Sequence, residues 1–460
     1  MNSPPATLAT LLAYLRTQSS ASAAEIGAAL GVSQPTVSRL IAAAADQVAR
    51  IGKARSTRYA ATRQVGRNGS IWPLYRLDAT TKGVRLGQLQ ALHDGGYLFI
   101  ADMPCPAFFI GDFRDGRYPG LPWFIDDQRP QGFLGRAFAR RIADDIHVDA
   151  VLDHWTPDDY AIAILQYGTD PPGNLVLGDV AYRRAVQQIF EPTHVIADEA
   201  REQAYLRLAD EAMAGDAPGS SAGGEQPKFT VTLKSGEQLR AAIVKFSERA
   251  DTDAARRWAD LLRCEHIAGQ VMRKHGLPAA SSQRIEAGGR VFLESERFDR
   301  GPELWRRGFV SLAALDADFY GHGRIHWWRF AGQLQRDGWI GADDARLLTI
   351  ASLFGELIGN TDMHLGNAAL VLDIERPFAL APMYDMLPML FRPGSGGEIV
   401  PRELEVRPPL PEQRTEWLAA AAAAEDFWSQ VIACQQVTEG FRPIARQAWA
   451  KVARARELLA

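Results

Sequence analysis

The chain has 460 residues, of which 47% are hydrophobic and 23% charged, and a formal net charge of −4, which together predict a globular protein of about two to four domains. Its apolar runs are shorter than the roughly 20 residues of a membrane span and its first residues lack the features of a signal peptide, so we expect a cytoplasmic protein without membrane segments. Its three cysteines are far apart and form no CxxC pair, which argues against a disulfide framework or a cysteine-ligated zinc site.

The N-terminal end is a basic, helical segment. Residues 1–63 contain seven Lys and Arg against two acidic residues, although the whole chain is acidic. Three short helices are predicted: "TLATLLAYLRTQ", "SAAEIGAALG", in which Ser22 precedes Glu25 as in a capping box, and "SQPTVSRLIAAAA". Followed by the basic hairpin "RIGKARSTRY", this order resembles a winged helix-turn-helix domain, which we assign to residues 1–65.

Such a domain binds double-stranded DNA. Its second helix of the pair enters the major groove, and the side chains that would face base edges here are Gln34, Thr36, Ser38 and Arg39. The hairpin would be the wing, in which the residues that could neutralise phosphates are Lys53, Arg55 and Arg58. The alternative is an alanine-rich helical docking domain that binds no DNA.

Residues 66–200 form the second predicted domain. Short strand-like runs such as "SIWPLYRL" and "GYLFIAD" alternate with Gly, Pro and aromatic residues, which predicts a compact α+β segment with long loops. Nothing catalytic stands out in this segment.

The third segment, residues 201–460, begins with a glycine-rich loop and a β-hairpin. The stretch "GDAPGSSAGGEQPKFTVTL" is followed by a turn at "KSGE" and a second strand that ends "AAIVKF". Glycines let a backbone approach phosphate oxygens closely because no Cβ intervenes. By itself the loop is weak evidence for phosphate binding, because glycine-rich loops are common.

Lys245 ends the second strand among apolar residues, and the following helix carries Glu265 in the middle of an apolar stripe. An unpaired buried carboxylate is costly, so Glu265 needs a cationic partner, for which Lys245 is the candidate. Protein kinases hold the α- and β-phosphates of ATP with such a strand lysine and helix glutamate. A plain buried salt bridge is the alternative.

The loop "NTDMHLGN" follows an apolar helix that ends at Gly359. Asp362 and Asn367 have the D-x-x-x-x-N spacing with which kinases place a carboxylate for the hydroxyl proton and an amide oxygen for magnesium. A strand-like "AALVLD", a turn and "FALAPMYD" then lead to Asp385, where kinases keep their main magnesium ligand. Each element is weak alone, but all of them occur in kinase order, which predicts phosphoryl transfer with ATP and Mg2+.

With these stretches the chain resembles the HipA family of bacterial serine/threonine kinases, which are toxins of type II toxin-antitoxin modules. The matching pieces are "SSAGGEQPKF", "AAIVKF", "ESERFDR", "NTDMHLGN" and "LAPMYD", and the fused helix-turn-helix makes the chain most similar to the YjjJ-like branch. The resemblance covers most of the chain beyond residue 65. It implies an α+β fold, in which a two-lobed, HipA-like protein kinase with an all-helical C-terminal lobe follows the winged helix-turn-helix domain.

Carried over by position, the resemblance implies roles for individual residues. Asp362 would be the catalytic base, and Asn367 and Asp385 would hold magnesium. The residues that would contact ATP are Gly223, Gly224, Glu225, Gln226, Lys228, Lys245, Glu265, Glu296, Arg297, Phe298, Asp299, His364 and Tyr384. Of these, Glu296 to Phe298 would form the hinge edge for adenine, and Asp299 would lie near the ribose.

The resemblance also implies autophosphorylation in the glycine-rich loop. The family modifies a serine that corresponds to Ser221 here, with the adjacent Ser220 as a rival acceptor. The added phosphate would eject the loop and stop ATP binding. Pro227 stands where some relatives have Glu, and its fixed φ would stiffen this loop.

We therefore expect a protein serine/threonine kinase with a fused DNA-binding domain. By family analogy its substrate is a protein with a Ser or Thr acceptor, such as a translation factor or an aminoacyl-tRNA synthetase. HipA toxins usually depend on a separate helix-turn-helix antitoxin, but a chain with its own such domain could do without one. Two alternatives stay open: a small-molecule kinase of the aminoglycoside or choline type, which His364 in D-x-H-x-x-N also resembles, and a transcription regulator that senses nucleotide without turnover.

Overall fold

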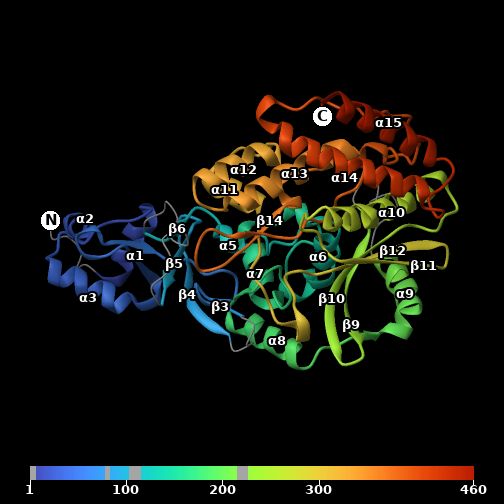
Figure 1. Cartoon of the computed structure of the whole chain (residues 1–460). Helices are drawn as coiled ribbons and strands as arrows, with labels where there is room; N and C mark the ends of the chain where they lie inside the picture. Colours follow the sequence, from blue (N-terminus) through green and yellow to red (C-terminus); the bar gives the residue numbers. More distant parts are fainter. Residues whose placement is uncertain (1–6, 78–82, 103–114, 215–225, 460) are drawn as a thin grey trace. The chain divides into compact units, whose positions relative to one another are not determined.

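The computed structural model describes residues 7–77, 83–102, 115–214 and 226–459, and the chain divides into two compact units. The first unit comprises Met1–Pro130 and Ala139–Phe190, and the second comprises Gln131–Phe138 and Glu191–Ala460 (Figure 1). Helix α6 (Gly132–Ile146) contributes residues to both. Within the described ranges, no helix combines the length and the apolar character needed to cross a bilayer.

Three helices open the first unit, α1 (Leu8–Thr17), α2 (Ala23–Leu30) and α3 (Gln34–Ala44). The predicted capping box is present at α2, because Ser22 Oγ accepts from the Glu25 N–H and Glu25 Oε2 accepts from the Ser22 N–H at 2.7 Å. Gly31 ends α2 with a φ of 64°, a left-handed conformation that glycine adopts without strain. The residues that these helices bury in a common core include Leu11, Leu15, Ile26 and Val37.

The hairpin after α3 packs against the sheet that follows it. Strands β1 (Val48–Ile51) and β2 (Arg58–Ala61) pair antiparallel. Their buried residues share a core with the next sheet, formed by Ala49, Ile51, Ala60, Leu92 and Leu98. Arg63, just after β2, donates to the Leu92 carbonyl at 2.6 Å and pairs with Asp158 at 2.6 Å. The segment assigned to residues 1–65 is therefore joined to the rest of the first unit by buried contacts.

A five-stranded antiparallel sheet forms the centre of the rest of the first unit. Its strand order is β6-β5-β4-β3-β7. The strands are β3 (Ile71–Arg76), β4 (Val84–Ala91), β5 (Tyr97–Ala101), β6 (Arg117–Tyr118) and β7 (Leu175–Leu177). The helices of this part are α5 (Trp123–Asp126), α7 (Pro157–Tyr167) and α8 (Asp179–Phe190). The α+β character expected of this segment is present.

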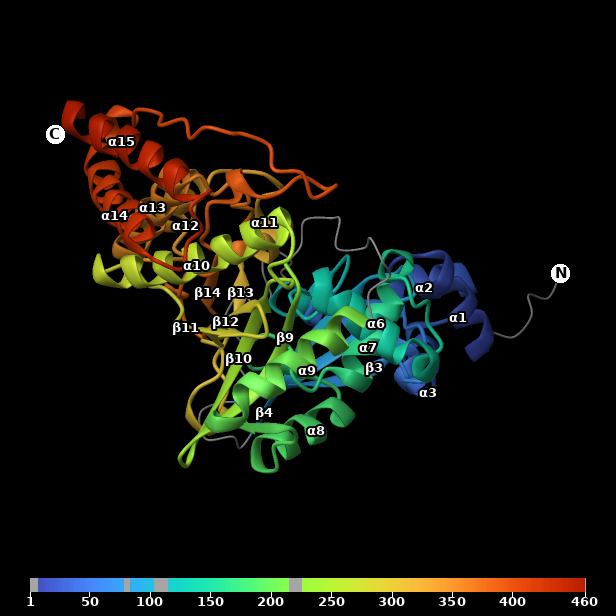
Figure 2. The ribbon, with the colours of Figure 1, turned by 90° about the vertical axis from the view of Figure 1, so that its right-hand side faces the viewer.

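The second unit begins with another five-stranded sheet, in the order β11-β12-β10-β9-β8. The strands are β8 (Val195–Ala197), β9 (Lys228–Ser235), β10 (Gln238–Phe246), β11 (Ser282–Ala287) and β12 (Arg290–Glu296). Strand β8 runs parallel to β9, and the other pairs are antiparallel. Two helices accompany the sheet, α9 (Arg201–Ala214) and α10 (Asp253–Lys274), and can be followed in Figure 2.

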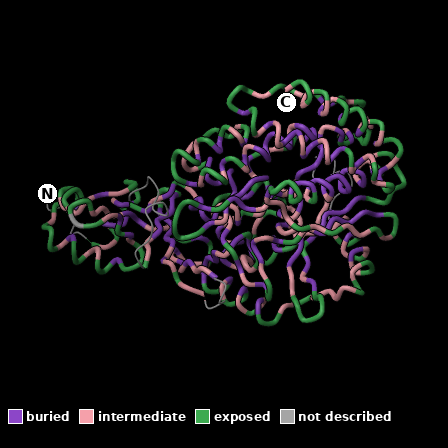
Figure 3. The backbone as a smooth tube through the Cα atoms, in the orientation of Figure 1, coloured by how far each residue is buried: buried purple, intermediate pink, exposed green. Residues whose placement is uncertain are grey.

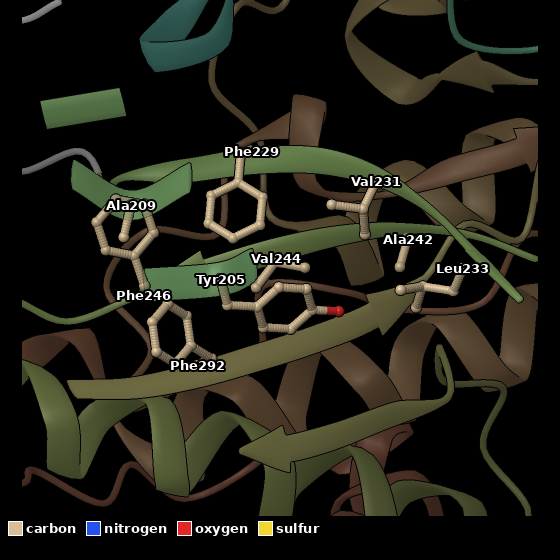
Figure 4. Close-up of a cluster of buried hydrophobic side chains, with 9 residues drawn as sticks. All are labelled: Tyr205, Ala209, Phe229, Val231, Leu233, Ala242, Val244, Phe246 and Phe292. Atoms are coloured by element: carbon tan, nitrogen blue, oxygen red, sulfur yellow. The ribbon is translucent and has the colours of Figure 1, made fainter. Parts of the chain in front are cut away.

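The two helices cover opposite faces of the sheet. This follows from the packing of successive β12 residues, because side chains alternate between the two faces along a strand. Phe292 packs with residues of α9, in the cluster of aromatic and aliphatic side chains drawn in Figure 4. Its neighbours Val291 and Leu293 pack instead against Ala259 and Leu262 of α10. Lys245 is opposite Leu293 in the β10–β12 register and therefore faces α10.

A buried carboxylate joins α9 to this sheet. Glu294 on β12 is 1% exposed and accepts a hydrogen bond from the Tyr205 hydroxyl at 2.6 Å. The guanidinium groups of Arg201 and Arg240 lie 3.2 and 2.5 Å from its oxygens. Burial and the neighbouring Glu294 raise the pKa of Tyr205, so its hydroxyl stays protonated and can donate. Two cations and one donor thus compensate the buried charge.

The C-terminal lobe is helical apart from one short sheet. Its helices are α11 (Leu312–Phe319), α12 (Trp327–Arg336), α13 (Ala342–Ile358), α14 (Arg414–Ala433) and α15 (Arg442–Leu459). Its strands are β13 (Val310–Ser311), β14 (Ala369–Val371) and β15 (Ala379–Leu380), paired antiparallel. Figure 3 shows buried segments along the inner sides of these helices and exposed ones on α15. The lobe expected to be all-helical therefore includes a small sheet, two strands of which form the predicted hairpin before Asp385.

Candidate active site

Lys245 and Glu265 form the ion pair that the sequence predicts. The Nζ atom of Lys245 on β10 lies 2.6 Å from Oε1 of Glu265 on α10. Both residues are buried, with 6% and 8% of their surfaces exposed. Each of the two charges therefore compensates the other for the water that burial removes.

Asp385 is a second carboxylate partner of Lys245. Its Oδ1 lies 2.5 Å from Nζ, and the side chain is partly exposed. The backbone of Asp385 has a φ of 55°, a region that residues other than glycine seldom occupy and that costs of order 1–3 kcal/mol. Lys245 thus lies between two carboxylates, and carboxylate oxygens are ligands that suit a divalent cation.

The charges at this site shift one another's pKa values. Burial by itself would lower the pKa of Lys245, but the carboxylates of Asp385 and Glu265 raise it above the usual range. Burial raises the pKa of Glu265 despite the nearby lysine. Burial acts to raise the pKa of Asp385 as well, but Lys245 and Lys228 outweigh it and lower the pKa. At neutral pH Lys245 is charged and Asp385 is ionised, the form that binds a metal.

Asn360 links the loop of Asp362 to Asp385. Its Oδ1 accepts from the Asp362 N–H at 3.1 Å, and its Nδ2 donates to the Asp385 carbonyl at 3.1 Å. The residue is 6% exposed. Sequence reasoning missed it, because its place directly after the helix-terminating Gly359 does not show that its side chain is buried.

The loop from Asp362 to Asn367 is held by its own hydrogen bonds. The Asn367 side-chain Nδ2 donates to the Asp362 carbonyl at 2.8 Å, and the Asn367 N–H donates to the His364 carbonyl at 3.0 Å. Asn367 is 7% exposed, whereas Asp362 is exposed. Within the described ranges, nothing donates to Oδ1 of Asn367 and nothing pairs with the Asp362 carboxylate. The first is suited to a metal and the second to an incoming hydroxyl.

Two aromatic residues support this loop. The Tyr384 hydroxyl donates to the Gly366 carbonyl at 2.7 Å, and its ring stacks on Phe298 with centroids 5.8 Å apart. The Gly366 N–H donates to Nδ1 of His364 at 3.1 Å. In this structure Tyr384 and His364 shape the loop, and their expected contacts with ATP stay predictions.

The segment after β12 was expected to form the adenine hinge. The Glu296 N–H donates to the Ser281 carbonyl and the Arg297 N–H donates to the Ala241 carbonyl, at 2.8 and 2.9 Å. Asp299 is 7% exposed and accepts from Arg297 at 2.9 and 3.0 Å and from Arg300 at 2.8 Å. The hinge and ribose contacts stay predictions, and a ribose contact would require Asp299 to leave one of its arginines.

Of the predicted glycine-rich loop and the start of β9, the structure describes only the last residues, among them Gln226 and Lys228. Gln226 Nε2 donates to the Phe246 carbonyl at 3.0 Å, and Lys228 pairs in register with Lys245. The remaining residues of the predicted loop lie outside the described ranges, namely Ser220, Ser221, Gly223, Gly224 and Glu225.

Asp385 and Asn367 stay the residues predicted to hold magnesium. A carboxylate and an amide oxygen are hard oxygen ligands of the kind that Mg2+ takes, with the other positions filled by water and substrate phosphates. A cluster of three or more His, Cys, Asp or Glu side chains with metal-site geometry does not occur among the described residues. A magnesium ion that is bound partly by nucleotide phosphates needs fewer protein ligands than such a cluster provides.

The predicted DNA-binding residues lie on the first unit. Gln34, Ser38 and Arg39 of α3 are exposed and Thr36 is half-buried. On the hairpin, Lys53 and Arg55 are exposed. Arg58 differs, because it donates to Ser20 Oγ and the Ser20 carbonyl at 2.8 and 2.7 Å and pairs with Glu25 at 3.1 Å. The guanidinium group of Arg58 is therefore largely engaged in contacts within the domain.

Comparisons with known proteins assign this arrangement to a family. Residues 68–186 match the family model of the YjjJ-like toxin middle domain, and residues 220–455 match the HipA-like C-terminal domain. The chain is 34% identical to Toxin YjjJ of Escherichia coli (strain K12) over 450 residues, 98% of each chain. A chain of the Shewanella oneidensis MR-1 toxin-antitoxin complex of HipA, HipB and operator DNA has a similar fold, with a TM-score of 0.54 at 16% identity, over 84% of this chain and 97% of that one. The chain therefore belongs to the HipA family of toxins, with the middle domain of its YjjJ-like members.

Proposed function

We propose that the chain is an ATP- and Mg2+-dependent protein serine/threonine kinase. The observation that carries the proposal is the joint geometry of Lys245 and Asp362. The lysine lies between Glu265 and Asp385, and Asn360 holds the backbone of Asp385 to that of the exposed Asp362. Phosphoryl transfer needs a cation, metal ligands and a proton acceptor, and these residues can supply each of them.

In the proposed reaction Asp362 orients the acceptor hydroxyl and takes its proton. The hydroxyl oxygen forms a bond to the γ-phosphorus of ATP as the bond from that phosphorus to the β–γ bridging oxygen breaks, so ADP leaves. Lys245 holds the α- and β-phosphates, and Glu265 keeps the lysine in place. Magnesium, held by Asp385 and Asn367, would neutralise charge on the phosphates.

The first unit supports binding of double-stranded DNA. The helices α2 and α3, the exposed face of α3 and the basic hairpin have the order of a winged helix-turn-helix, and the S. oneidensis complex to which the chain is similar contains operator DNA. That complex also contains HipB, whereas this chain carries a candidate DNA-binding domain of its own. We therefore propose autoregulation or targeting through DNA without a compulsory antitoxin, in the cytoplasm.

The test is phosphate transfer from γ-labelled ATP by the full chain. With Mg2+, label should enter the chain itself and at least one protein of a cell extract, and partial hydrolysis should release phosphoserine or phosphothreonine. Label that enters only small molecules would favour the aminoglycoside or choline type of kinase. ATP binding without any transfer would favour the nucleotide-sensing regulator.

A further inference from the structure

Helix α15 is a basic helix at the surface of the C-terminal lobe. Four arginines and one lysine against one glutamate give it a formal charge of +4, although the whole chain carries −4. Its buried residues are Ala445, Ala448 and Val452, and this face packs on α14, as Figures 1 and 2 show. The opposite face is exposed (Figure 3). No residue of the proposed kinase site lies on this helix.

The exposed face of α15 carries a tryptophan. Of the eleven tryptophans, all of which lie in the described ranges, Trp449 is the only exposed one, at 42%. Its indole makes no ring contact and no hydrogen bond with any other described residue. Its neighbours Ala450 and Ala453 are small and leave the flat face of the ring accessible. An indole in water lacks the hydrophobic gain of burial, so a ligand that covers it gains affinity.

Arginines accompany Trp449 on the same face of α15. Arg446 lies one turn before it and Arg442 a further turn away, because residues three or four apart are neighbours on a helix surface. Arg454 follows Arg446 after about two turns. Arg446 and Arg454 are exposed and form no ion pair or hydrogen bond with other residues that the structure describes. Both guanidinium groups are therefore available to an anionic partner.

The other two cations of α15 are neutralised by acidic residues of other segments. Lys451 pairs with Glu403 at 2.9 Å, and Arg456 pairs with Glu425 at 2.7 Å. After these pairs are subtracted, the three arginines and Glu457 remain, with a formal charge of +2. The exposed face is therefore positive even when the ion pairs of α15 with other described residues are counted.

An exposed aromatic ring between arginines fits a single strand of nucleic acid, in which phosphates bind the cations and a base stacks on the ring. An acidic protein would use the arginines but not the flat face of the indole. A lipid surface needs a broad apolar face, and α15 already packs its apolar face on α14. Cellular DNA is mostly duplex with its bases stacked inside, whereas RNA presents unpaired bases in loops and ends.

We infer that the exposed face of α15 binds single-stranded RNA. Trp449 stacks on a base, and Arg446 and Arg454 bind phosphates on either side of it. The surface is separate from the α3 and hairpin residues proposed to bind duplex DNA and from the proposed kinase site.

The test is fluorescence anisotropy of a labelled oligouridine of about 12 nucleotides, a usual site size, titrated with the full chain. The wild type should bind saturably. Trp449→Ala should weaken binding by about 5- to 100-fold, because the stacked base loses its platform, and Trp449→Phe should keep most of the affinity. Leu458→Ala is the matched control, since it removes an exposed apolar side chain without a ring from the same helix and should change nothing.

Arginine variants test the phosphate contacts. Arg446→Gln should weaken binding and reduce the slope of log affinity against log salt concentration by about 0.7, the value for one phosphate of a single strand. Arg207→Gln, an exposed arginine of α9 that pairs with Glu211, should leave the affinity unchanged. Arg55→Gln in the basic hairpin should also leave it unchanged, which separates this surface from the one proposed for DNA.

Several results would overturn the inference: no binding of RNA by the wild type, equal binding by Trp449→Ala, or loss of binding in Arg55→Gln but not in Trp449→Ala. An oligothymidine of the same length that binds more tightly than the RNA would overturn the assignment to RNA. Vesicles of phosphatidylglycerol that bind the wild type but not Trp449→Ala, where RNA does not bind, would assign the face to a lipid surface. Circular dichroism of each variant verifies that it is folded.

Discussion

The side-chain amide of Asn360 donates to the backbone carbonyl of Asp385 at 3.1 Å. The same amide accepts from the Asp362 N–H, so one buried side chain fixes the backbones of the proposed metal ligand and the proposed base. Asp385 has a left-handed backbone, which other contacts must hold in place. Asn360 is therefore a positioning residue in the proposed mechanism.

Asn360→Ala should lower kcat by about 10- to 100-fold, because a lost buried hydrogen bond at each end costs about 1–3 kcal/mol in correct positioning. It should also raise the Mg2+ concentration that gives half-maximal activity, whereas ATP affinity without metal stays near that of the wild type. Steady-state kinetics over a range of Mg2+ concentrations measures both. Gln430→Ala removes an amide–carboxylate hydrogen bond of α14 and is the control. Equal Mg2+ dependence in wild type and Asn360→Ala would contradict the positioning role.

Asp362→Asn should abolish most phosphoryl transfer and leave ATP affinity roughly intact, since the change removes the proton acceptor and keeps the shape of the side chain. A loss of at least about 100-fold in the rate of label transfer is expected. Asp343→Asn, an exposed change in the first turn of α13, is the matched control. Wild-type transfer by Asp362→Asn would remove this residue from the mechanism.

Asp385→Asn should eliminate the dependence of nucleotide binding on Mg2+, because the amide cannot supply the charge that the metal requires. Calorimetric titration of ATP with Mg2+ and with EDTA measures the difference. Asp373→Asn, on an exposed turn of the hairpin that precedes Asp385, should keep the wild-type difference. If Asp385→Asn also keeps the wild-type difference in ATP affinity between Mg2+ and EDTA, another residue holds the metal.

Ser221 is expected to become phosphorylated when the chain is incubated with ATP and Mg2+. The phosphate would compete with those of ATP for the same donors, so the modified chain should bind ATP more weakly. Ser221→Ala should bind ATP and resist this loss. Peptide mass spectrometry locates the phosphate, and its presence on Ser220 alone, or on Ser221 without an effect on ATP affinity, would contradict the switch.

Arg55→Gln should weaken DNA binding about equally for all sequences and reduce the salt dependence by roughly one counterion, whereas Gln34→Ala should change sequence preference. Arg58→Gln should mainly lower the melting temperature, because Arg58 holds Ser20 and Glu25. Arg16→Gln removes the same charge from an exposed position of α1 and is the control. Gel shifts at several salt concentrations test this. If the chain does not bind DNA even at low salt, the alternative of a helical docking domain is favoured.

Asp426 on α14 should stabilise the fold in a pH-dependent way. Burial opposes ionisation, but hydrogen bonds from Gln430, Lys274 and His275 lower the pKa of Asp426 to about 2. Because the folded pKa is below the unfolded one, the stabilisation is present above about pH 4 and is lost as the pH falls toward 2. Asp426→Asn should cost about 1 kcal/mol at pH 7, allowing for solvent screening, and less at pH 3. Thermal unfolding at both pH values measures this, and a cost that does not shrink in acid would contradict it.

Features that depend on short spacings were predictable from the sequence. The capping box of Ser22 and Glu25 and the turn at Gly31 follow from neighbouring residues, and the Lys245–Glu265 pair follows from the face on which an otherwise apolar helix carries one carboxylate. The spacing of Asp362 and Asn367 can also be read from the sequence, but the kinase role that it predicts stays a prediction. Local geometry and the cost of burying a lone charge suffice for such predictions.

Only the tertiary structure decided which distant groups meet. Lys245 has a second partner in Asp385, 140 residues away, and Arg58 is drawn to Ser20 instead of remaining free for phosphates. The hydrogen bonds from Arg297 and Arg300 to Asp299 likewise depend on how the segment after β12 folds. A sequence gives the charge of each group but not its distance from the others. Because Coulomb and hydrogen-bond energies fall off over a few ångströms, packing alone selects among partners that the sequence makes equally plausible.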